Sequence, residues 1–269
     1  MAAEHGERPW PEPPIEPPGR GLLDGRRVVV TAAAGAGIGS AVARRALVEG
    51  AEVLISDVHE RRLSSTCDWL EAETGSRPAA ISCDVTSETH VQALMDTAAD
   101  RLGGIDVMMN NAGLGGSVRL VDMTDEQWSA VLSVTLDGTM RCTRAALRRM
   151  IDQGTGGAIV NNASVSGWRA QTEQAHYAAA KAGVMALTRC AALEAAEHGI
   201  RVNCVAPSLA WHPFLAKTTD AALLVDLAQK EAFGRPAEPW EVANVMVFLA
   251  SDLAGYMTGE VVSVSSQHP

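Results

Sequence analysis

The sequence lacks long apolar runs, closely spaced cysteines and the apolar leader of a secreted protein. No stretch reaches the roughly 18 consecutive apolar residues that suggest a transmembrane helix, so we expect no membrane span. The five cysteines are scattered and include no Cys-x-x-Cys pair, which indicates reduced core residues rather than disulfides or a metal site. Because proline and glutamate occupy the N-terminus where a signal peptide would be apolar, we expect a cytoplasmic protein.

Basic residues are also outnumbered by acidic ones. The 22 lysines and arginines against 32 aspartates and glutamates give a formal net charge of −10. This balance argues against nucleic acid or an anionic membrane as the main partner. Moderate acidity of this kind otherwise keeps a protein soluble and points to no particular ligand.

The composition changes near residue 20. Residues 1–20 are rich in proline and glutamate and predict an extended, flexible arm. Trp10 and Ile15 could dock this arm onto a neighbour, although a loose tail is the simpler expectation. Residues 21–269 contain no repeat or internal linker and predict one domain. Within it, the pattern breaks over 207–235, where we expect a lid over the substrate.

Apolar runs alternate with helical patterns along the domain. The runs that predict strands are 27–31, 52–57, 79–84, 105–109, 158–160, 200–205 and 260–264. Between the fourth and fifth runs, Thr124 and Gln127 fit a capping box that opens one long helix to about Ile151. The alternation predicts a single Rossmann-type, doubly wound α/β domain, with a seven-stranded parallel sheet flanked by helices on both faces.

A loop of small residues follows the first predicted strand and leads into a helix. Small residues let backbone N–H groups approach a pyrophosphate, and the N-terminus of the helix favours its charge. Glycine clusters also occur at ordinary tight turns, so the flanking strand and helix carry the argument. The residues of this loop that we expect to contact a dinucleotide are Thr31, Ala33, Gly35, Gly37, Ile38 and Gly39.

Asp57 ends the second predicted strand, roughly 20 residues beyond the loop. A carboxylate there accepts hydrogen bonds from both hydroxyls of an unmodified ribose and repels a 2′-phosphate. This predicts NAD rather than NADP as the cofactor. Arg61 and Arg62 lie nearby and could reach a phosphate, although a solvated helix face also explains them.

Ser164, Tyr177 and Lys181 form the candidate catalytic group. Tyr177 and Lys181 are four residues apart in an alanine-rich helical pattern, so they share one helix face. An ammonium near a phenol lowers the tyrosine pKa, which suits proton exchange with an alcohol or carbonyl oxygen. Ser164, at a strand end, could donate a hydrogen bond to that oxygen. Taken alone, the pair could equally be neighbours on a solvated helix.

Together these segments resemble the short-chain dehydrogenase/reductase family from about Leu22 to the end. Ser164, Tyr177 and Lys181 match its catalytic serine, tyrosine and lysine, and Asn110–Gly113 matches its motif beside the cofactor. The resemblance implies hydride transfer between nicotinamide and a substrate carbon, interconverting a secondary alcohol and a ketone. Tyr177 would be the acid/base, Ser164 would hold the substrate oxygen, and Lys181 would bind the nicotinamide ribose. The further cofactor contacts it implies are Cys83, Asp84, Val85, Asn111, Ala112, Gly113, Tyr177, Lys181, Pro207, Leu209 and His212.

The chain departs from the family pattern at several positions. The glycine loop is one residue longer than usual, and Ala32 replaces a glycine. Thr135 stands where a catalytic asparagine is usual, and its hydroxyl could hold a relay water. Ser208 replaces a glycine after Pro207. His212 replaces a threonine that contacts the nicotinamide amide; it could bind that amide or the substrate, or be a surface histidine.

Three further segments resemble one subgroup of the family that acts in breakdown of steroid C and D rings. They are Asn161–Gln171, Glu231–Arg235 and Val264–Pro269. The resemblance implies a methyl-indene carboxyl-CoA thioester as substrate. Trp168, Trp211, Phe214 and Leu215 could form apolar walls around its rings, and Arg169 and Lys217 could meet phosphates of CoA. Ordinary packing of the aromatics and a solvated arginine are the alternatives.

Two other functions fit the same residues. One is a 3-oxoacyl carrier-protein or 3-oxoacyl-CoA reductase, which normally prefers NADPH. The other is a dinucleotide-binding sensor without turnover, which Thr135 alone favours. The family resemblance also implies a homotetramer, because its matching helices pair between subunits.

Overall fold

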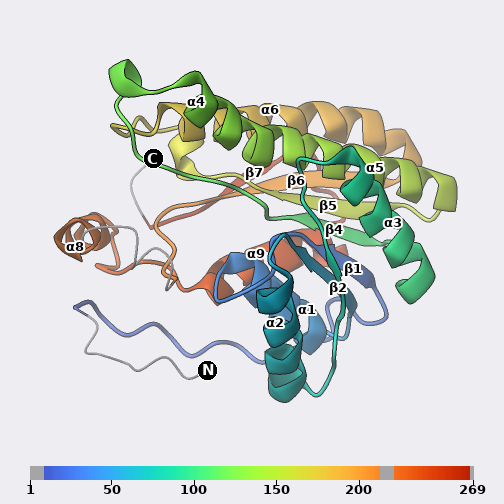
Figure 1. The fold of residues 1–269 in the computed structure, drawn as a ribbon. Coiled ribbons are helices and arrows are strands. Elements are labelled where there is room, and N and C mark those ends of the chain that lie inside the picture. The colour runs from blue at the N-terminus through green and yellow to red at the C-terminus, as the bar shows by residue number, and fades with distance from the viewer. Residues whose placement is uncertain (1–8, 213–220, 267–269) are drawn as a thin grey trace.

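Seven parallel strands lie side by side in the order β3-β2-β1-β4-β5-β6-β7. The computed structural model describes residues 9–212 and 221–266 (Figure 1). The strands are β1 (Arg27–Val30), β2 (Glu52–Asp57), β3 (Ala79–Ser82), β4 (Val107–Asn110), β5 (Gly157–Asn162), β6 (Ile200–Pro207) and β7 (Val261–Val264). The prediction of a seven-stranded parallel sheet is therefore confirmed, with strand ends shifted by up to two residues.

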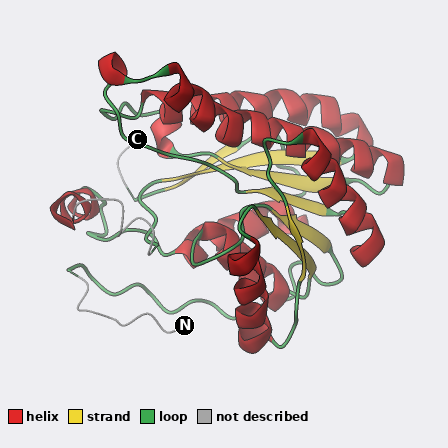
Figure 2. Cartoon of the chain, viewed as in Figure 1, coloured by secondary structure: helices red, strands yellow, loops and turns green. Residues whose placement is uncertain are grey.

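Helices cover both faces of the sheet (Figure 2). Their bounds are α1 (Ile38–Val48), α2 (Glu60–Thr74), α3 (Glu88–Leu102), α4 (Asp125–Leu132), α5 (Gly138–Gln153), α6 (Ala175–Ala195), α8 (Ala221–Gln229) and α9 (Pro239–Ala250). One core joins α1, α2 and α9 to one face, and another joins α3, α5 and α6 to the opposite face. Because successive strand residues alternate sides, Val28 and Val30 pack into the first core and Val29 into the second. None of the helices within the described ranges could cross a membrane.

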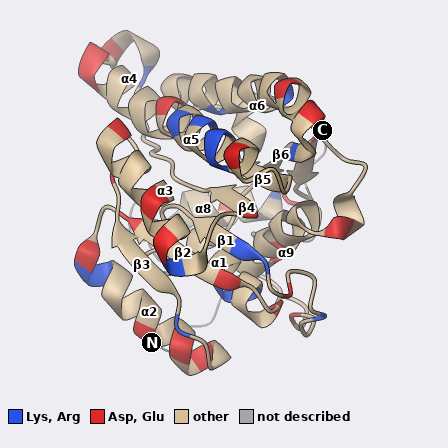
Figure 3. Cartoon of the chain, turned by 90° about the vertical axis from the view of Figure 1, so that its right-hand side faces the viewer, with Lys and Arg blue, Asp and Glu red and all other residues tan. Residues whose placement is uncertain are grey.

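Complementary charges join the outer surfaces of α3 and α5. Arg144 pairs with Glu88 at 2.6 Å, and Arg149 pairs with Asp96 at 2.6 Å. Figure 3 shows the basic band of α5 beside the acidic positions of α3. Exposed pairs of this kind contribute at most about 1 kcal/mol each, so the apolar core beneath them dominates the packing of these helices.

The strand order reverses direction at β1, which pairs with β2 on one side and β4 on the other. In open parallel sheets, ligands bind at the carboxyl ends of the strands beside such a switch point. Thr31 joins the two loops there. Its Oγ1 accepts hydrogen bonds from the backbone N–H of Asn111 at 3.0 Å and of Ala112 at 3.2 Å. The loops after β1 and β4 are thereby held against each other.

The single long helix predicted from Thr124 to Ile151 is interrupted. Its capping box is confirmed, since Thr124 N donates to Gln127 Oε1 at 3.0 Å and Gln127 N donates to Thr124 Oγ1 at 3.2 Å. A π-helical turn, Ser133–Asp137, then separates α4 from α5. Such turns insert an extra residue into a helix and often mark functional positions. Here the turn is centred on Thr135.

Residues 9–20 form no helix or strand, and the last of them lie against α1. A buried ion pair of Arg45 and Glu49 on and after α1 forms hydrogen bonds with the backbone of this segment. Glu49 Oε2 accepts from the backbone N–H of Arg20 at 2.8 Å and of Leu22 at 2.9 Å, while Arg45 Nη1 donates to the carbonyl of Pro17 at 2.6 Å. Burial alone would raise the pKa of Glu49, but these N–H groups and the Arg45 cation hold it below its usual value.

The region predicted as a lid, 207–235, has mixed structure. β6 continues to Pro207, and α8 occupies Ala221–Gln229. Residues 213–220 lie outside the described part of the chain, as do residues 1–8 of the predicted arm. The backbone after β6 is tied to a later segment, since Ala237 N donates to Leu209 O at 2.8 Å and Trp211 N donates to Ala237 O at 2.8 Å.

Ala32, in the glycine loop, has a left-handed backbone with φ of 50°. This conformation costs an L-residue roughly 1–2 kcal/mol, whereas glycine adopts it freely. The position is the one where the family pattern has glycine. The alanine therefore strains the loop at the switch point.

We predict that Ala32→Gly leaves the free energy of unfolding unchanged or raises it by up to about 1 kcal/mol. The relief of strain is partly offset by the greater entropy of glycine in the unfolded chain. Ala43→Gly, at a buried position in the middle of α1, is the control and should lower the free energy by about 1–2 kcal/mol. Urea unfolding measures both; equal losses in the two variants would contradict strain at Ala32.

Candidate active site

Tyr177 and Lys181 lie one turn apart on α6. Lys181 Nζ lies 5.5 Å from the centroid of the Tyr177 ring. Only 3% of the lysine surface is exposed, and its ammonium donates to the carbonyl oxygen of Asn162, at the end of β5, over 2.6 Å. A buried cation requires such partners because it has lost its hydration. The lysine is therefore held between the carboxyl end of β5 and the tyrosine ring.

Ser164 follows β5 and is brought to the same helix by a tight approach. Its Oγ accepts from the backbone N–H of Ser166 at 3.2 Å, within the short 3-10 turn Val165–Gly167. A Cβ atom on Gly167 would lie 3.0 Å from the backbone nitrogen of Ala182 on α6, which only glycine permits without movement. The turn that carries Ser164 thus packs directly on the helix that carries Tyr177 and Lys181.

The loop after β4 lies over the same pair. A Cβ atom on Gly113 would be 3.3 Å from Lys181 Nζ, and one on Gly115 would be 3.9 Å from Tyr177 Cδ2. Gln174, just before α6, fixes the loop by donating to Gly116 O at 2.8 Å. The loop predicted to lie beside the cofactor therefore touches both members of the predicted catalytic pair.

Thr135 is fully buried, and its hydroxyl is bonded in both directions to one residue of this loop. Thr135 Oγ1 accepts from Leu114 N at 2.9 Å and donates to Leu114 O at 3.1 Å. These two bonds leave the hydroxyl proton committed to a backbone carbonyl. The side chain therefore ties the π-helical turn to the loop after β4. The relay role expected for Thr135 stays a prediction, in which the hydroxyl would accept from the water through its remaining lone pair.

Sequence reasoning missed two residues of this neighbourhood. His176 is buried, and its Nδ1 accepts from Tyr177 N at 2.9 Å, so the first turn of α6 is held by the residue before the tyrosine. Asn162 provides the carbonyl that receives Lys181, and its Nδ2 donates to Asn111 Oδ1 at 2.9 Å. A signal existed for Asn162, because Asn161-Asn162 places two amides at the end of an otherwise apolar strand.

The glycine loop forms an open cradle at the N-terminus of α1. A Cβ atom on Gly35 or Gly37 would meet no atom within 4 Å, so both face open space. A Cβ atom on Gly39 would instead lie 2.3 Å from Ala32 O and 2.5 Å from Asn111 Nδ2. Any residue with a side chain would therefore clash at this position. The first N–H groups of a helix have no partner within it. In this structure Gly35 N donates to Thr66 Oγ1 at 2.9 Å and Gly37 N donates to Ser40 Oγ at 3.1 Å. The open space, the helix N-terminus and the close helix packing together fit a dinucleotide pyrophosphate.

Asp57 lies at the carboxyl end of β2 beside this cradle. Its Oδ2 accepts from Ala34 N at 3.2 Å, and its Oδ1 accepts from His59 N at 2.9 Å, with His59 Nδ1 at 3.0 Å. The carboxylate is nearly buried and its position is set by backbone donors. Arg61 and Arg62 lie on the exposed side of α2.

Three of the predicted cofactor contacts, Cys83, Asp84 and Val85, follow β3, next to Asp57. Cys83 N donates to Asp57 O at 3.0 Å. Asp84 Oδ1 accepts from Thr86 N at 2.9 Å and Thr86 Oγ1 at 2.8 Å, and these bonds hold the pKa of Asp84 below its usual value. Val85 is buried against Gly138 at the start of α5. Asp57 and this group therefore share one end of the sheet.

Four of the five cysteines are buried, as expected, but Cys190 on α6 is exposed, so the expectation of core cysteines is wrong there. Burial raises the pKa of Cys83 to about 12 and that of Cys204 to about 11, so neither is a reactive thiolate near neutral pH. Within the described ranges, no three His, Cys, Asp or Glu side chains gather as a metal site would require.

The residues predicted to meet the substrate follow β5 and β6, which are neighbouring strands. Trp168 is 47% exposed, and Arg169 is half-buried. Trp211 is half-buried and meets Trp10 of the arm edge-on, with ring centroids 5.0 Å apart and planes at 67°. Burial lowers the pKa of His212, so at neutral pH its imidazole offers hydrogen bonding rather than charge. Pro207 is buried at the end of β6, and Leu209 follows it.

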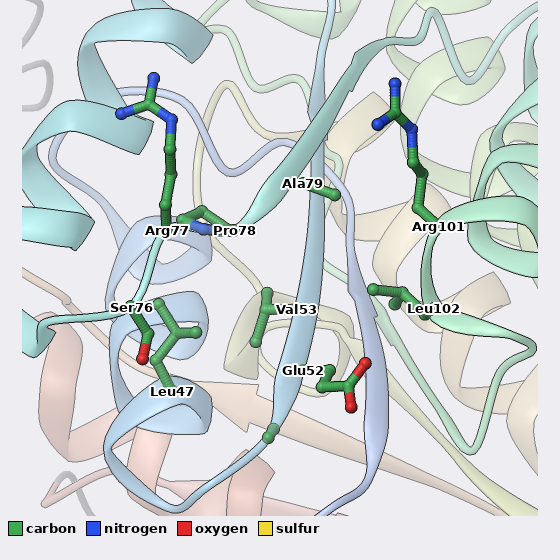
Figure 4. A pocket seen from close by; sticks show the side chains of 10 residues that line it. Leu47, Glu52, Val53, Ser76, Arg77, Pro78, Ala79, Arg101 and Leu102 are labelled. Atoms are coloured by element: carbon green, nitrogen blue, oxygen red, sulfur yellow. The ribbon is translucent and has the colours of Figure 1, made fainter.

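A separate hollow of about 420 Å³ lies at the opposite end of the sheet (Figure 4). Its lining includes Glu52 and Ala79, at the amino ends of β2 and β3, and the side chains of Arg77 and Arg101. Arg77 is already paired with Asp68 at 2.8 Å and Glu71 at 2.7 Å. Because parallel sheets bind ligands at their carboxyl ends, this hollow is not the dinucleotide site.

Known proteins resemble the chain over almost its whole length. A family profile described as enoyl-(acyl carrier protein) reductase matches residues 32–266. The (5R,7aS)-5-hydroxy-7a-methyl-1-oxo-2,3,5,6,7,7a-hexahydro-1H-indene-carboxyl-CoA reductase of Mycobacterium tuberculosis is 62% identical over 256 residues, covering 95% of this chain and 98% of that protein. The cis-4-hydroxycyclohexanecarboxylate dehydrogenase of Sinomonas cyclohexanicum is 41% identical over 241 residues, covering 88% of this chain and 94% of that protein.

The architecture has close parallels among solved structures. A short-chain dehydrogenase from Mycobacterium smegmatis superposes with a TM-score of 0.85 at 58% identity, covering 96% of this chain and 99% of that one. The profile, the relatives and the superposition agree with the fold. The chain belongs to the short-chain dehydrogenase/reductase family of NAD(P)-dependent oxidoreductases.

Proposed function

We propose that this enzyme uses NAD to interconvert a secondary alcohol and a ketone on a ring-bearing CoA thioester formed in steroid breakdown. The observation that carries the reaction is the buried Lys181 ammonium, 5.5 Å from the Tyr177 ring, beside a glycine cradle that fits a dinucleotide. The substrate class rests on the 62% identical relative, whose name describes a hydroxy-methyl-indene carboxyl-CoA reductase. Such identity over 95% of the chain supports a shared substrate class.

Ser164, Tyr177 and Lys181 have distinct roles in this proposal. Ser164 donates a hydrogen bond to the substrate oxygen and orients it toward the tyrosine. Tyr177 gives a proton to that oxygen in reduction and takes it back in oxidation. Lys181 stabilises the phenolate electrostatically and offers its remaining ammonium protons to the cofactor ribose. Bound nicotinamide supplies or accepts the hydride.

Thr135 and His176 act as positioning residues. Thr135 holds Leu114 through two hydrogen bonds, and Leu114 follows Gly113, whose backbone borders the Lys181 ammonium. His176 holds the backbone of Tyr177. Neither residue needs to touch the substrate for its loss to misplace the proton donor.

The choice of NAD rests on Asp57. Its carboxylate is oriented by Ala34 N and His59 N, beside the residues that follow β3. A fixed negative charge there accepts from two ribose hydroxyls and repels a 2′-phosphate. In this arrangement the cofactor would lie against Thr31, the glycine loop, Cys83–Val85, Asn111–Gly113 and Pro207–His212.

The remaining parts of the proposal concern surroundings and assembly. Trp168, Arg169 and Trp211 would border the substrate, since they follow adjacent strands at the end of the sheet that carries Ser164. The region 207–235 would cover it. We also infer a cytoplasmic homotetramer, an assembly that the family resemblance implies through its paired helices.

Tyr177→Phe should lower kcat by about 10²–10⁴-fold, because the variant keeps the ring but loses the transferable proton. Binding of NAD should change by less than about threefold. Tyr256→Phe is the control, since Tyr256 is fully exposed and the only other tyrosine in the sequence. Formation of reduced nicotinamide with a hydroxylated ring CoA thioester measures the rates. A Tyr177→Phe enzyme within tenfold of wild type would rule out the proposed role.

Asp57→Ala should weaken NAD binding by about 10–100-fold, because two charge-assisted hydrogen bonds are lost. NADP should bind the variant better than it binds wild type. Glu52→Ala, at the other end of the same strand, is the control and should leave both affinities unchanged. Calorimetry with each dinucleotide provides the comparison. A wild-type preference for NADPH would instead favour a 3-oxoacyl thioester reductase.

A further inference from the structure

The N-terminal arm connects two distant parts of the molecule. Residues 16–22 lie against α1, whereas Trp10 lies against Trp211 after β6. In Figure 1 the arm runs from the α1 side of the domain toward α8. A tail that only trails from the domain would make neither contact.

The first attachment is a set of buried polar contacts. Glu49 is fully buried and accepts the N–H groups of Arg20 and Leu22, while Arg45 donates to the carbonyls of Pro17 and Pro18 and pairs with Glu49. The chain also passes so close to α1 that a Cβ atom on Gly19 would lie 2.5 Å from Val48 O. Removing one member of such a buried pair is costly, so this end of the arm is held firmly.

Glu16 extends this attachment by pairing with Arg44. Glu16 lies six positions after Trp10, and three of the five residues between them are proline. Prolines restrict φ and favour a stiff, extended chain. The position of Trp10 is therefore guided by the attachment on α1.

The second attachment is aromatic. Trp10 and Trp211 pack edge-on with centroids 5.0 Å apart. The neighbouring Pro11 lies near Gly234, where an added Cβ atom would meet its Cδ at 4.0 Å. The arm thus lies beside both ends of the region 207–235, which is predicted to cover the substrate.

Trp211 has a fixed backbone. Its N–H donates to Ala237 O at 2.8 Å, and Ala210 forms a parallel bridge with Ala237. The side chain of Trp211, by contrast, is half-buried and has Trp10 as its aromatic neighbour. Contact with Trp10 therefore limits the directions in which this indole can point.

We propose that the N-terminal arm is a working part of the substrate site: Trp10 braces Trp211 as a wall for the rings of the substrate. The proposal rests on the proposed function, because it places the substrate beside the carboxyl ends of β5 and β6. Trp10 is a positioning residue that acts through Trp211. Its loss would therefore weaken binding of a large ring-bearing substrate more than it slows the proton and hydride transfers.

The test compares Trp10→Ala with Ile15→Ala. Both shorten an apolar side chain of the arm, but Ile15 is 95% exposed, so Ile15→Ala is a matched control. An edge-on aromatic pair corresponds to roughly a threefold to tenfold change in an equilibrium constant. We expect Trp10→Ala to raise KM for the ring-bearing CoA thioester by that factor and to change kcat less than twofold. Trp10→Phe, which keeps an aromatic ring, should have a KM close to that of wild type.

Hydrogen exchange of the free enzyme provides a readout that does not depend on turnover. Trp10→Ala should speed exchange of the amides in 208–212 and 231–237, and Ile15→Ala should not. If wild type turns over the thioester while Trp10→Ala matches Ile15→Ala in KM and exchange, the bracing role is overturned and the proposed function stands. If wild type turns over no alcohol or ketone, the proposed function fails. In that case, faster exchange in Trp10→Ala would show only a structural contact between Trp10 and Trp211, and the role of Trp10 in the substrate site would be overturned.

Discussion

The burial of one ammonium group dominates the geometry of the candidate active site. Lys181 is almost entirely removed from water, and a cation in that position must be bonded or it destabilises the fold. Its bond to Asn162 O links α6 to the end of β5. The same cation borders Gly113, where any side chain would crowd it, and lies near the Tyr177 ring. A change in any of these elements would therefore disturb the environment of the tyrosine.

The parallel sheet explains why residues distant in the sequence meet at this cation. All seven strands point the same way, so the segments after β1, β2, β4, β5 and β6 emerge at one edge. Hydrogen bonds then join these segments in pairs. Thr31 holds the loop after β4, Asn162 holds Asn111, and Thr135 holds Leu114. These bonds join the segments after β1, β4 and β5 and the π-helical turn to one another.

Much of this arrangement could be predicted because local patterns determine it. The strand periodicity, the capping box of Thr124 and the shared helix face of Tyr177 and Lys181 all depend on residues close in sequence. The break in the long helix could not be predicted in this way. The residues of the π-helical turn carry no local signal for an extra residue, and the turn is held by the bonds between Thr135 and Leu114, 21 positions apart. Long-range contacts of this kind leave no periodic signal.

By itself, the sequence determined the class of fold, and it predicted the loop for a dinucleotide and Tyr177 as the proton donor. Each of these depends on short segments whose spacing has few physical interpretations. Only the tertiary structure decided that the Thr135 hydroxyl is committed to a backbone carbonyl, that Asn162 receives the lysine and that Trp10 lies against Trp211. These contacts join residues between 19 and 201 positions apart in the chain. They arise because close packing brings separate segments together, and no local preference of either segment specifies its partner.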